Sequence, residues 1–331
     1  RGLIPRLWSS EHAANYMDFT SPLDFEILDE YKNRETIIER VNSFRIREQE
    51  GELTGEDYND FFRTLGTYLD ISKPSLFDNL NFLFTYQINY MYWRYFMWNF
   101  SGRQNDIQGH GDAMRGNWLS GYGIVDNARL GNQDEFAPYY SAQNASNNRF
   151  FYLPLILGFI GLLFHFYRAP KDAFVVLLAF LFTGLAIIVY LNPRPYEPRE
   201  RDYAYAGSFF FFAMWIGIGV YALYESFKSF GRKEYIKIAT VLGAGLAGAL
   251  IFDIGSEVSM PTTVSWLIMS AIGGGAMYLM SGLGRVLKKD MHGAFVAVVL
   301  CLSVPIIMGV QGWDDHDRSL KTSAHDLAYN Y

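Results

Sequence analysis

This 331-residue chain has only one cysteine, no long run of one charge and no even spread of hydrophobicity. Its single cysteine, Cys301, excludes a disulfide framework and a metal site built from several thiolates. The net charge of −6 and the absence of a long basic tract argue against a nucleic-acid partner. The chain has neither an initial Met nor an N-terminal signal peptide, so we expect it to be an internal piece of a longer protein.

The hydrophobic residues, half of the total, are concentrated in one part of the chain. Residues 1–149 are polar and charged, whereas residues 150–313 contain six apolar runs of roughly 17–20 residues, each long enough to cross ~30 Å of hydrocarbon as a helix. The runs are 151–167, 173–191, 208–224, 236–254, 264–283 and 294–311. Six buried helices of a soluble enzyme are the alternative, which the short charged connections disfavour. The sequence therefore predicts an all-α polytopic membrane protein.

The connections between the runs alternate in charge, which predicts their orientation. Lys and Arg dominate the connections at 168–172, 228–237 and 285–290, whereas residues 253–263 contain two acids and no cation. Because cationic loops stay in the cytoplasm, we expect these three connections on the inner side of the bilayer. The other polar segments then lie on the outer side: 1–149, 192–207, 255–263 and the tail, 312–331.

The polar leader contains two amphipathic helical patterns, at 29–48 and 56–68, followed by an aromatic segment at 76–100. Tyr and Trp are very dense in this last segment and include Trp98, while Asp, Asn, Gln and Arg interrupt it. Tyr and Trp favour the membrane interface. We expect an interfacial helix at about 76–100; a seventh membrane span is the alternative.

Three polar stretches contain the candidate site residues. In the first, the glycine-rich loop 102–111, Gly residues permit tight turns and Arg103, Asp106 and His110 offer charge and an imidazole. A lone histidine in such a loop is more often an ordinary surface residue. We therefore place more weight on the loop as a whole than on His110.

The second stretch, 192–207, combines three prolines with Arg194, Arg199 and Arg201 on the predicted outer side. Planar guanidinium groups bind phosphate through paired hydrogen bonds, and the prolines stiffen the backbone that presents them. Glu197 and Glu200 balance the charge, so a salt-bridge network that braces two helices is an equal alternative. Arg199 and Arg201 share one face of an extended segment and are the expected phosphate-binding pair.

The third stretch begins the tail after the sixth apolar run and contains Asp314, Asp315, His316 and Asp317. Carboxylates with water are ligands for a hard divalent cation, and one of them is equally a candidate general base. Consecutive residues cannot all face one ion, so at most two or three would be ligands. A polar cap that leads into a further domain is the third interpretation.

Three segments carry a resemblance to a known family: YMYWRYFMWNFSGRQNDIQGHG (90–111), YLNPRPYEPRERDYAYAGSFFFFAMWIGIGV (190–220) and GWDDHDRS (312–319). They resemble an uncharacterised bacterial membrane-protein family grouped with protein O-mannosyltransferase-like glycosyltransferases of the GT-C superfamily. The resemblance implies a multi-pass protein of the inner membrane of a Gram-negative bacterium, with large periplasmic loops. It also implies further membrane helices before residue 1 and a periplasmic domain after residue 331.

The same resemblance implies transfer of a sugar from a polyprenyl-phosphate donor to an acceptor at the outer membrane face. The main catalytic acid of GT-C enzymes usually lies in a first outer loop, which would precede this chain. The candidate catalytic residues here are Asp314, Asp315, Asp317 and His110. The candidate substrate-binding residues are Arg199, Arg201, Arg194, Glu197, Glu200, Arg103, Asp106 and Trp98. The candidate ligands for a divalent cation are Asp314, Asp315 and His316.

Two other functions remain open at this stage. A non-catalytic scaffold of an envelope assembly would use residues 1–149 to bind partner proteins. A transporter or flippase would need polar groups inside the spans, where His165 is the main one. Because charge gathers at one predicted face, we favour the enzyme and expect the three polar stretches to form one outer cavity.

Overall fold

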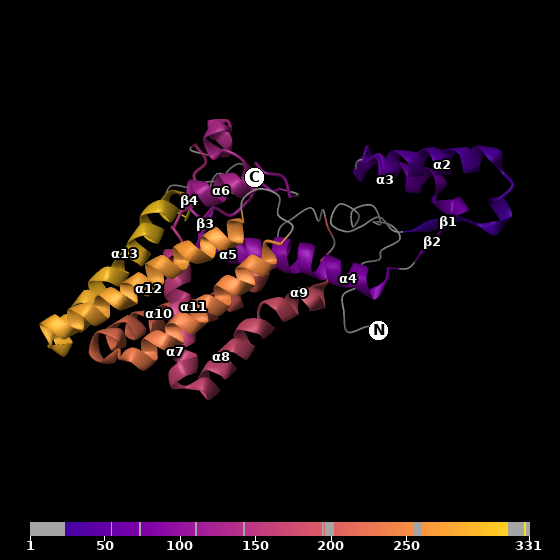
Figure 1. Cartoon of the computed structure of the whole chain (residues 1–331). Helices are drawn as coiled ribbons and strands as arrows, with labels where there is room; N and C mark the ends of the chain where they lie inside the picture. The colour runs from indigo at the N-terminus through magenta and orange to yellow at the C-terminus, as the bar shows by residue number, and fades with distance from the viewer. Residues whose placement is uncertain are drawn as a thin grey trace. The chain divides into compact units, whose positions relative to one another are not determined.

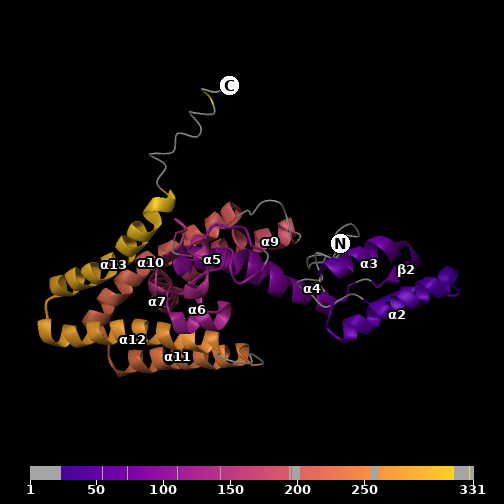
Figure 2. The same cartoon turned by 90° about the horizontal axis from the view of Figure 1, so that it is seen from above.

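The computed structural model describes residues 24–53, 55–72, 74–109, 111–141, 143–193, 195, 202–254, 260–316 and 328. The chain divides into two compact units (Figures 1 and 2). The first comprises Arg1–Trp93 and Gly184–Ala204, and the second comprises Arg94–Thr183 and Tyr205–Tyr331.

The first unit begins with a small module in which two helices pack on a pair of short strands. Strands β1 (Phe25–Ile27) and β2 (Leu69–Ile71) pair antiparallel, and helices α2 (Glu35–Gln49) and α3 (Gly55–Leu65) lie between them in the sequence. Two 3₁₀ turns, Asp29–Tyr31 and Gly66–Tyr68, complete it. Both helices were predicted from their apolar periodicity, whereas the three-residue strands are too short to leave a pattern.

Aromatic rings form the core of this module. Phe25, Phe44 and Phe61 are all buried, and the rings of Phe44 and Phe61 stack with centroids 3.8 Å apart. The Tyr58 hydroxyl donates a 2.8 Å hydrogen bond to Glu48, which joins α3 to α2. Burial of such large rings gives even a small module its own hydrophobic core.

The aromatic segment is helical throughout, as predicted, but not uniformly α-helical. Helix α4 (Leu76–Phe82) continues as a π-helix, η3 (Leu83–Trp93), before α5 (Arg94–Phe100). Eleven residues of π-helix are unusual, because π-helical turns mostly occur singly and often at functional sites. Within the first unit, η3 packs on α9 (Leu185–Leu191), and Gln87 donates a 2.7 Å hydrogen bond to the Asn192 side chain.

The second unit is built around a bundle of long apolar helices: α7 (Leu153–Arg168), α8 (Pro170–Phe182), α10 (Ala206–Ser229), α11 (Arg232–Phe252), α12 (Pro261–Leu287) and α13 (Asp290–His316). Five helical segments of the described chain are long and apolar enough to cross a membrane. They are Pro170–Leu191, Asp202–Lys228, Arg232–Phe252, Pro261–Leu287 and Asp290–Asp315. The protein therefore has the architecture predicted for it, an all-α polytopic membrane protein.

The first predicted run differs in length from the other five. Its helix begins only at Leu153 and has 16 residues, fewer than a full span. The two preceding residues, Phe151 and Tyr152, have φ values of 55° and 59° and turn the chain into the helix. Apolarity alone could not distinguish these two turn residues from the helix that follows them.

Close contact between α7 and α10 holds the middle of the bundle together. At Gly161 an added Cβ would lie 1.8 Å from the Trp215 carbonyl oxygen, and at Gly219 it would lie 2.2 Å from the Leu157 carbonyl oxygen. Small residues at such contacts let membrane helices approach closely. Buried side chains from α7, α10, α12 and α13 complete the core: Leu157, Leu223, Phe227, Met280, Ala297, Cys301 and Val304.

A polar cap, residues 101–149, covers one end of this bundle (Figure 1). It contains strands β3 (Gly102–Arg103) and β4 (Asn148–Arg149), helix α6 (Gly123–Leu130) and two 3₁₀ turns, Gln133–Glu135 and Pro138–Tyr140. The strands pair antiparallel, with Gly102 opposite Arg149. The cap is fixed to the bundle by the Arg149 backbone N–H, which donates a 2.6 Å hydrogen bond to Gln311 on α13.

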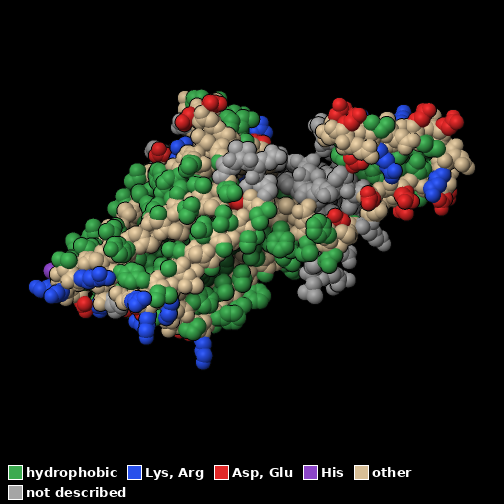
Figure 3. All heavy atoms as spheres, in the orientation of Figure 1, with side chains coloured by type: hydrophobic (Ala, Val, Ile, Leu, Met, Phe, Trp, Pro, Cys, Tyr) green, Lys and Arg blue, Asp and Glu red, His purple; other side chains and the backbone are tan. Residues whose placement is uncertain are grey.

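The three cationic connections meet at the other end of the bundle. Lys228 at the end of α10 pairs with Asp290 at the start of α13 at 3.1 Å, and Arg168 at the end of α7 pairs with Glu225 at 3.3 Å. The ammonium of Lys237 on α11 lies 4.3 Å from the centroid of the Tyr167 ring. Figure 3 shows the Lys and Arg side chains gathered at this end. The charge alternation in the sequence thus corresponds to two distinct ends of one bundle.

Candidate functional site

Two buried amides fix the glycine-rich loop of the cap. The Asn105 side chain accepts hydrogen bonds from the backbone N–H groups of Ile107 and Gly116, and it donates to the carbonyl oxygens of Met114 and Tyr140. Asn105 is fully buried and every hydrogen-bonding position of its amide is used. The loop is therefore held in one conformation by a side chain whose role could not be predicted from the sequence.

Gln104 has a similar role beside it. Its amide nitrogen donates to the Ala113 carbonyl oxygen at 2.9 Å and to Gln133 at 2.8 Å, and its oxygen accepts from Asn117 at 3.0 Å. The backbone here leaves no room for a side chain at Gly109, where a Cβ would lie 2.3 Å from the Arg115 carbonyl oxygen. These contacts make the loop a rigid support for its charged neighbours.

Arg103 is the charged residue that this loop positions most closely. It lies on β3, and its Nε donates a 3.1 Å hydrogen bond to the Asn105 carbonyl oxygen. Its guanidinium lies 4.1 Å from the centroid of the Trp98 ring, and its Nη1 is 3.9 Å from Oδ2 of Asp315. The side chain keeps 22% of its exposure, so this cation is fixed in place and still reachable from solvent.

Asp315 lies beside Arg103 and comes from the end of α13, the last long apolar helix of the described residues. Helix α13 continues to His316, so Asp314 and Asp315 lie on its final turn and not in a loop. Asp315 accepts a 2.9 Å hydrogen bond from the Ser146 hydroxyl, and its side chain is 23% exposed. Asp314 is exposed. Neighbouring residues on a helix point about 100° apart, so the two carboxylates are not equivalent.

A second arginine, Arg94, also lies close to the Trp98 ring. The ring is 7% exposed and lies 4.9 Å from the guanidinium of Arg94, which is itself buried and donates to the Gly116 carbonyl oxygen. Guanidinium groups are attracted to the faces of aromatic rings. In the structure the Trp98 ring is buried in the protein and contacts Arg103, and the predicted contact of Trp98 with a substrate stays a prediction.

The structure therefore brings two of the three polar stretches together. The glycine-rich loop supplies Arg103, the start of the tail supplies Asp315, and Asp106 accepts a 3.1 Å hydrogen bond from Asn144 within the cap. The remaining predicted residues lie outside the described chain, and their placement stays a prediction. They are Arg194, Glu197, Arg199, Glu200 and Arg201 of the proline-rich loop, with His110 and Asp317.

A metal site is not apparent in the described part of the chain. No group of three or more His, Cys, Asp or Glu side chains there could hold a metal ion. Of the three candidate ligands, Asp314 and Asp315 are described, but the His316 side chain is not. Asp315 accepts a hydrogen bond from the Ser146 hydroxyl and lies beside the Arg103 guanidinium, whose positive charge disfavours a cation at this carboxylate.

Sequence reasoning missed a second buried cluster in the cap. Asp126 on α6 accepts hydrogen bonds from the backbone N–H groups of Ser120 and Gly121, and burial raises the pKa of its carboxyl group. Arg129 lies 3.4 Å from the centroid of the Trp118 ring, and burial lowers the pKa of its guanidinium to about 10. Asp126 and Arg129 are three residues apart on one helix, which is the only sequence signal they give.

This second cluster joins the cap to the bundle. Tyr152, which precedes α7, shares a 2.8 Å hydrogen bond with Ser265 near the start of α12. Beside it, Asp253 accepts hydrogen bonds from the backbone N–H groups of Thr262 and Thr263 at the start of the same helix. The hydrogen bond between Tyr152 and Ser265 joins the start of α7 to the start of α12 at the capped end.

The fold and the capped end of the bundle define a class of protein: a multi-pass membrane protein with a rigid polar site at one end of its helices. Comparison with protein-family models, with curated proteins and with solved structures gave no match.

Proposed function

We propose that this protein is a membrane glycosyltransferase that moves a sugar from a polyprenyl-phosphate donor to an acceptor hydroxyl at the capped end of the bundle. The observation that supports this best is the pairing of Arg103 with Asp315. It places a cation and a carboxylate side by side where the helices meet the polar cap. Such a site suits a donor whose phosphate lies at a membrane surface and whose hydrocarbon tail remains in the bilayer.

The chemistry needs two groups that these residues provide. The bond between the anomeric carbon and the phosphate oxygen breaks, the acceptor oxygen bonds to that carbon, and the acceptor proton goes to a base. Arg103 would bind the leaving phosphate, because a guanidinium forms paired hydrogen bonds with it. Asp315, oriented by Ser146, would take the proton as general base.

An unused hydrogen-bond donor beside Arg103 also supports a ligand here. The indole N–H of Trp98 is buried and has no hydrogen-bond partner among the residues that the structure describes. A buried donor without an acceptor lowers stability, so an oxygen atom of a bound donor molecule would be favourable at this position. Trp98 would then act together with Arg103.

The proline-rich loop remains part of the proposal on sequence grounds alone. Arg199 and Arg201 are the expected phosphate-binding pair, with Arg194 beside them and Glu197 and Glu200 as their holding partners. By the family resemblance, the bilayer is the inner membrane of a Gram-negative bacterium and the capped end faces the periplasm.

A transporter has less support. His165, the main polar residue in the spans, accepts a 3.3 Å hydrogen bond from the Trp215 indole within the α7–α10 contact. It serves helix packing there, and it does not line a described path for a substrate. Intramembrane polar groups that mark such paths would face a cavity or another such group.

A scaffold has one specific observation in its favour. The module at residues 24–72 has its own aromatic core and a charged surface, as a docking domain for an envelope protein would. The two functions predict different results from the same preparation. An enzyme consumes the lipid-phosphate sugar, whereas a scaffold leaves it unchanged.

The test is transfer from radiolabelled polyprenyl-phosphate mannose by the full-length protein in proteoliposomes. Asp315→Asn should lower the rate by about a hundredfold or more, because it removes the general base. Asp134→Asn, which changes an exposed acid of the same cap, should leave the rate unchanged.

Arg103→Lys should weaken donor binding by about tenfold, because lysine keeps the charge and loses the planar fork. Arg115→Lys, at an exposed arginine of the cap, is its control.

Two results would contradict the proposal. Full activity of Asp315→Asn, in a protein that retains its thermal stability, would remove Asp315 as the base. Absence of both donor binding and transfer in the unmodified full-length protein would favour the scaffold.

A further inference from the structure

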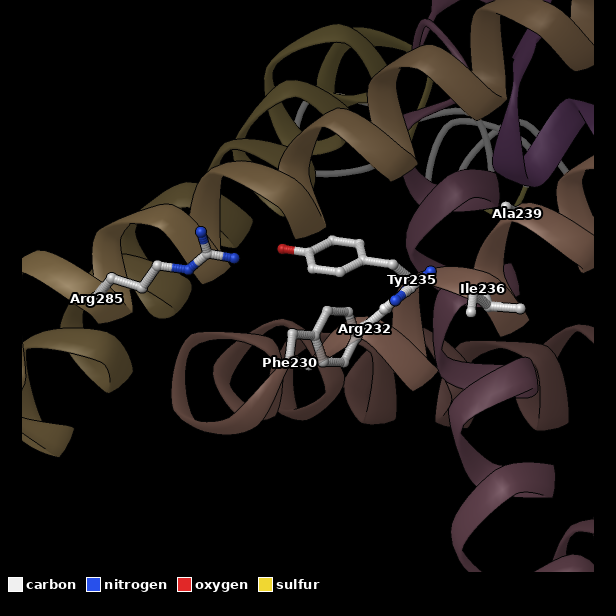
Figure 4. Close-up of a pocket in the computed structure, with 7 residues that line it drawn as sticks. Phe230, Arg232, Tyr235, Ile236, Ala239 and Arg285 are labelled. Carbon is white, nitrogen blue, oxygen red and sulfur yellow. The ribbon is translucent and has the colours of Figure 1, made fainter.

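An open cavity of about 460 Å³ lies at the cationic end of the bundle, away from the proposed site. It is formed by the first turns of α11 and the last turn of α12 (Figure 4). We call it the basic groove. Its lining residues are Phe230, Gly231, Arg232, Tyr235, Ile236, Ala239 and Arg285.

The two arginines of the basic groove carry charge that no residue of the described ranges neutralises. Arg232 and Arg285 are both exposed, and neither has an ion-pair partner among the residues that the structure describes. Two other cations at this end are paired, Lys228 with Asp290 and Arg168 with Glu225. The groove is therefore the place at this end where two guanidinium groups remain available to an anion.

A tyrosine hydroxyl inside the groove points to the same conclusion. Figure 4 shows the Tyr235 hydroxyl directed toward the guanidinium of Arg285. This oxygen is buried and has no hydrogen-bond partner among the described residues. The ring is held by edge contacts with Phe230 and by Tyr278, at centroid distances of 5.8 and 6.2 Å. A phosphate oxygen beside Arg285 would accept its hydrogen bond.

The wall of the groove is apolar and continues along a membrane-spanning helix. Arg232, Tyr235, Ile236 and Ala239 follow the i, i+3, i+4, i+7 spacing that places them on one face of α11. Ile236 and Ala239 are exposed, on a helix that is long and apolar enough to cross the bilayer. A ligand that complements both the two arginines and this apolar wall has an anionic head group and a hydrocarbon tail.

The net positive charge around the groove also favours contact with an anionic membrane surface. Nine Lys and Arg residues lie at this end of the bundle against four Asp and Glu residues. The cations are Arg168, Lys171, Lys228, Arg232, Lys233, Lys237, Arg285, Lys288 and Lys289, and the acids are Asp172, Glu225, Glu234 and Asp290. Basic pockets between membrane helices on the cytoplasmic side bind anionic lipid head groups.

We infer that the basic groove is a binding site for an anionic phospholipid of the leaflet at the cationic end. Arg232 and Arg285 bind its phosphate, Tyr235 donates a hydrogen bond to a phosphate oxygen, and an acyl chain lies along Ile236 and Ala239. The site is separate from the glycosyl-transfer site and does not depend on the proposed function.

Native mass spectrometry of the full-length protein with added lipid tests this inference. Phosphatidylglycerol should bind with at least about tenfold higher affinity than phosphatidylcholine, because both lipids carry the phosphate but the two arginines repel the choline cation. The double variant Arg232→Gln, Arg285→Gln should weaken phosphatidylglycerol binding by about thirtyfold. The double variant Lys288→Gln, Lys289→Gln removes the same charge at the same end outside the groove and should change binding by no more than about twofold. Tyr235→Phe should weaken binding by about threefold to tenfold through loss of one hydrogen bond.

Three outcomes would overturn the inference. Equal losses in the two double variants would mean that only the diffuse surface charge attracts lipid. Equal affinity for phosphatidylglycerol and phosphatidylcholine would exclude recognition of an anionic head group. Displacement of the lipid by millimolar inorganic phosphate would show a site for free phosphate. All the variants change exposed residues or one hydroxyl group, and an unchanged melting temperature establishes that each is folded.

Discussion

At the scale of single residues, buried amides and charges decide where the reactive groups of the cap lie. Asn105 and Gln104 make their hydrogen bonds mainly to loop backbone, and the Asn105 carbonyl oxygen accepts from Arg103. Arg103 in turn is held between this loop, Trp98 and Asp315. The position of one cation thus depends on buried neutral residues of the loop.

Asn105→Ala should lower the free energy of unfolding by about 3 kcal/mol, because it leaves several buried backbone groups without hydrogen bonds. Asn127→Ala, which removes an exposed asparagine side chain of α6, should change it by less than about 0.5 kcal/mol. Chemical denaturation of the protein in detergent micelles measures both. Equal effects of the two substitutions would show that the amide network of Asn105 does not hold the cap.

The sequence indicated Arg103 and Asp315 but not the residues that position them. A glutamine or asparagine in a polar loop looks the same in sequence whether it is exposed or fully buried. The contact between Arg103 and Asp315 joins residues far apart in the chain, and only the packing of the cap on α13 brings them together. Periodicity carries no information about such a contact.

At the scale of elements, glycine determines how closely the membrane helices pack. Gly219 on α10 lies against the backbone of Leu157 on α7, whereas Gly217, on the same helix, has nothing within 4 Å of an added Cβ. Substitution of each glycine by alanine therefore separates two effects: the loss of close packing between α7 and α10, and the general preference of a helix for alanine. Glycine-rich helices were visible in the sequence, but which glycine faces a neighbour was not.

Gly219→Ala should destabilise the bundle by about 1–3 kcal/mol, because the added methyl group overlaps the Leu157 carbonyl oxygen and forces the helices apart. Gly217→Ala should be neutral or slightly stabilising, since alanine favours the helix by up to about 1 kcal/mol. Thermal unfolding in detergent compares the two. A larger loss for Gly217→Ala would contradict the helix contact described here.

The aromatic segment is an element whose type was only partly predictable. Its length and apolar content predicted a helix, and the chain is helical from Leu76 to Phe100. Some of the rings that we expected at a membrane surface fill protein contacts, such as Phe96 and Phe100 against Phe212 at centroid distances of 4.8 and 4.6 Å. Tyr, Trp and Phe serve both purposes, so composition could not separate them. Its position relative to the bilayer remains a prediction.

At the scale of the whole molecule, the bundle of the second unit separates two chemistries. One end carries a rigid polar cap with Arg103 and Asp315, and the other carries three cationic turns and the basic groove. The two ends could be predicted, because long apolar runs and the alternating charge of the loops can be read directly from the sequence. The proposed sugar transfer at one end and lipid binding at the other both depend on these ends facing opposite sides of a membrane.

The most direct test of this arrangement is cysteine labelling in intact cells that express the full-length protein. Cys301→Ser first removes the cysteine of the described chain, and single cysteines are then introduced as Asn132→Cys in the cap or Lys288→Cys at the cationic end. Both positions are exposed and belong to the same unit. We predict that a membrane-impermeant maleimide labels Asn132→Cys in intact cells and labels Lys288→Cys only after the cells are permeabilised. Labelling of both positions in intact cells, or of Lys288→Cys alone, would contradict the account.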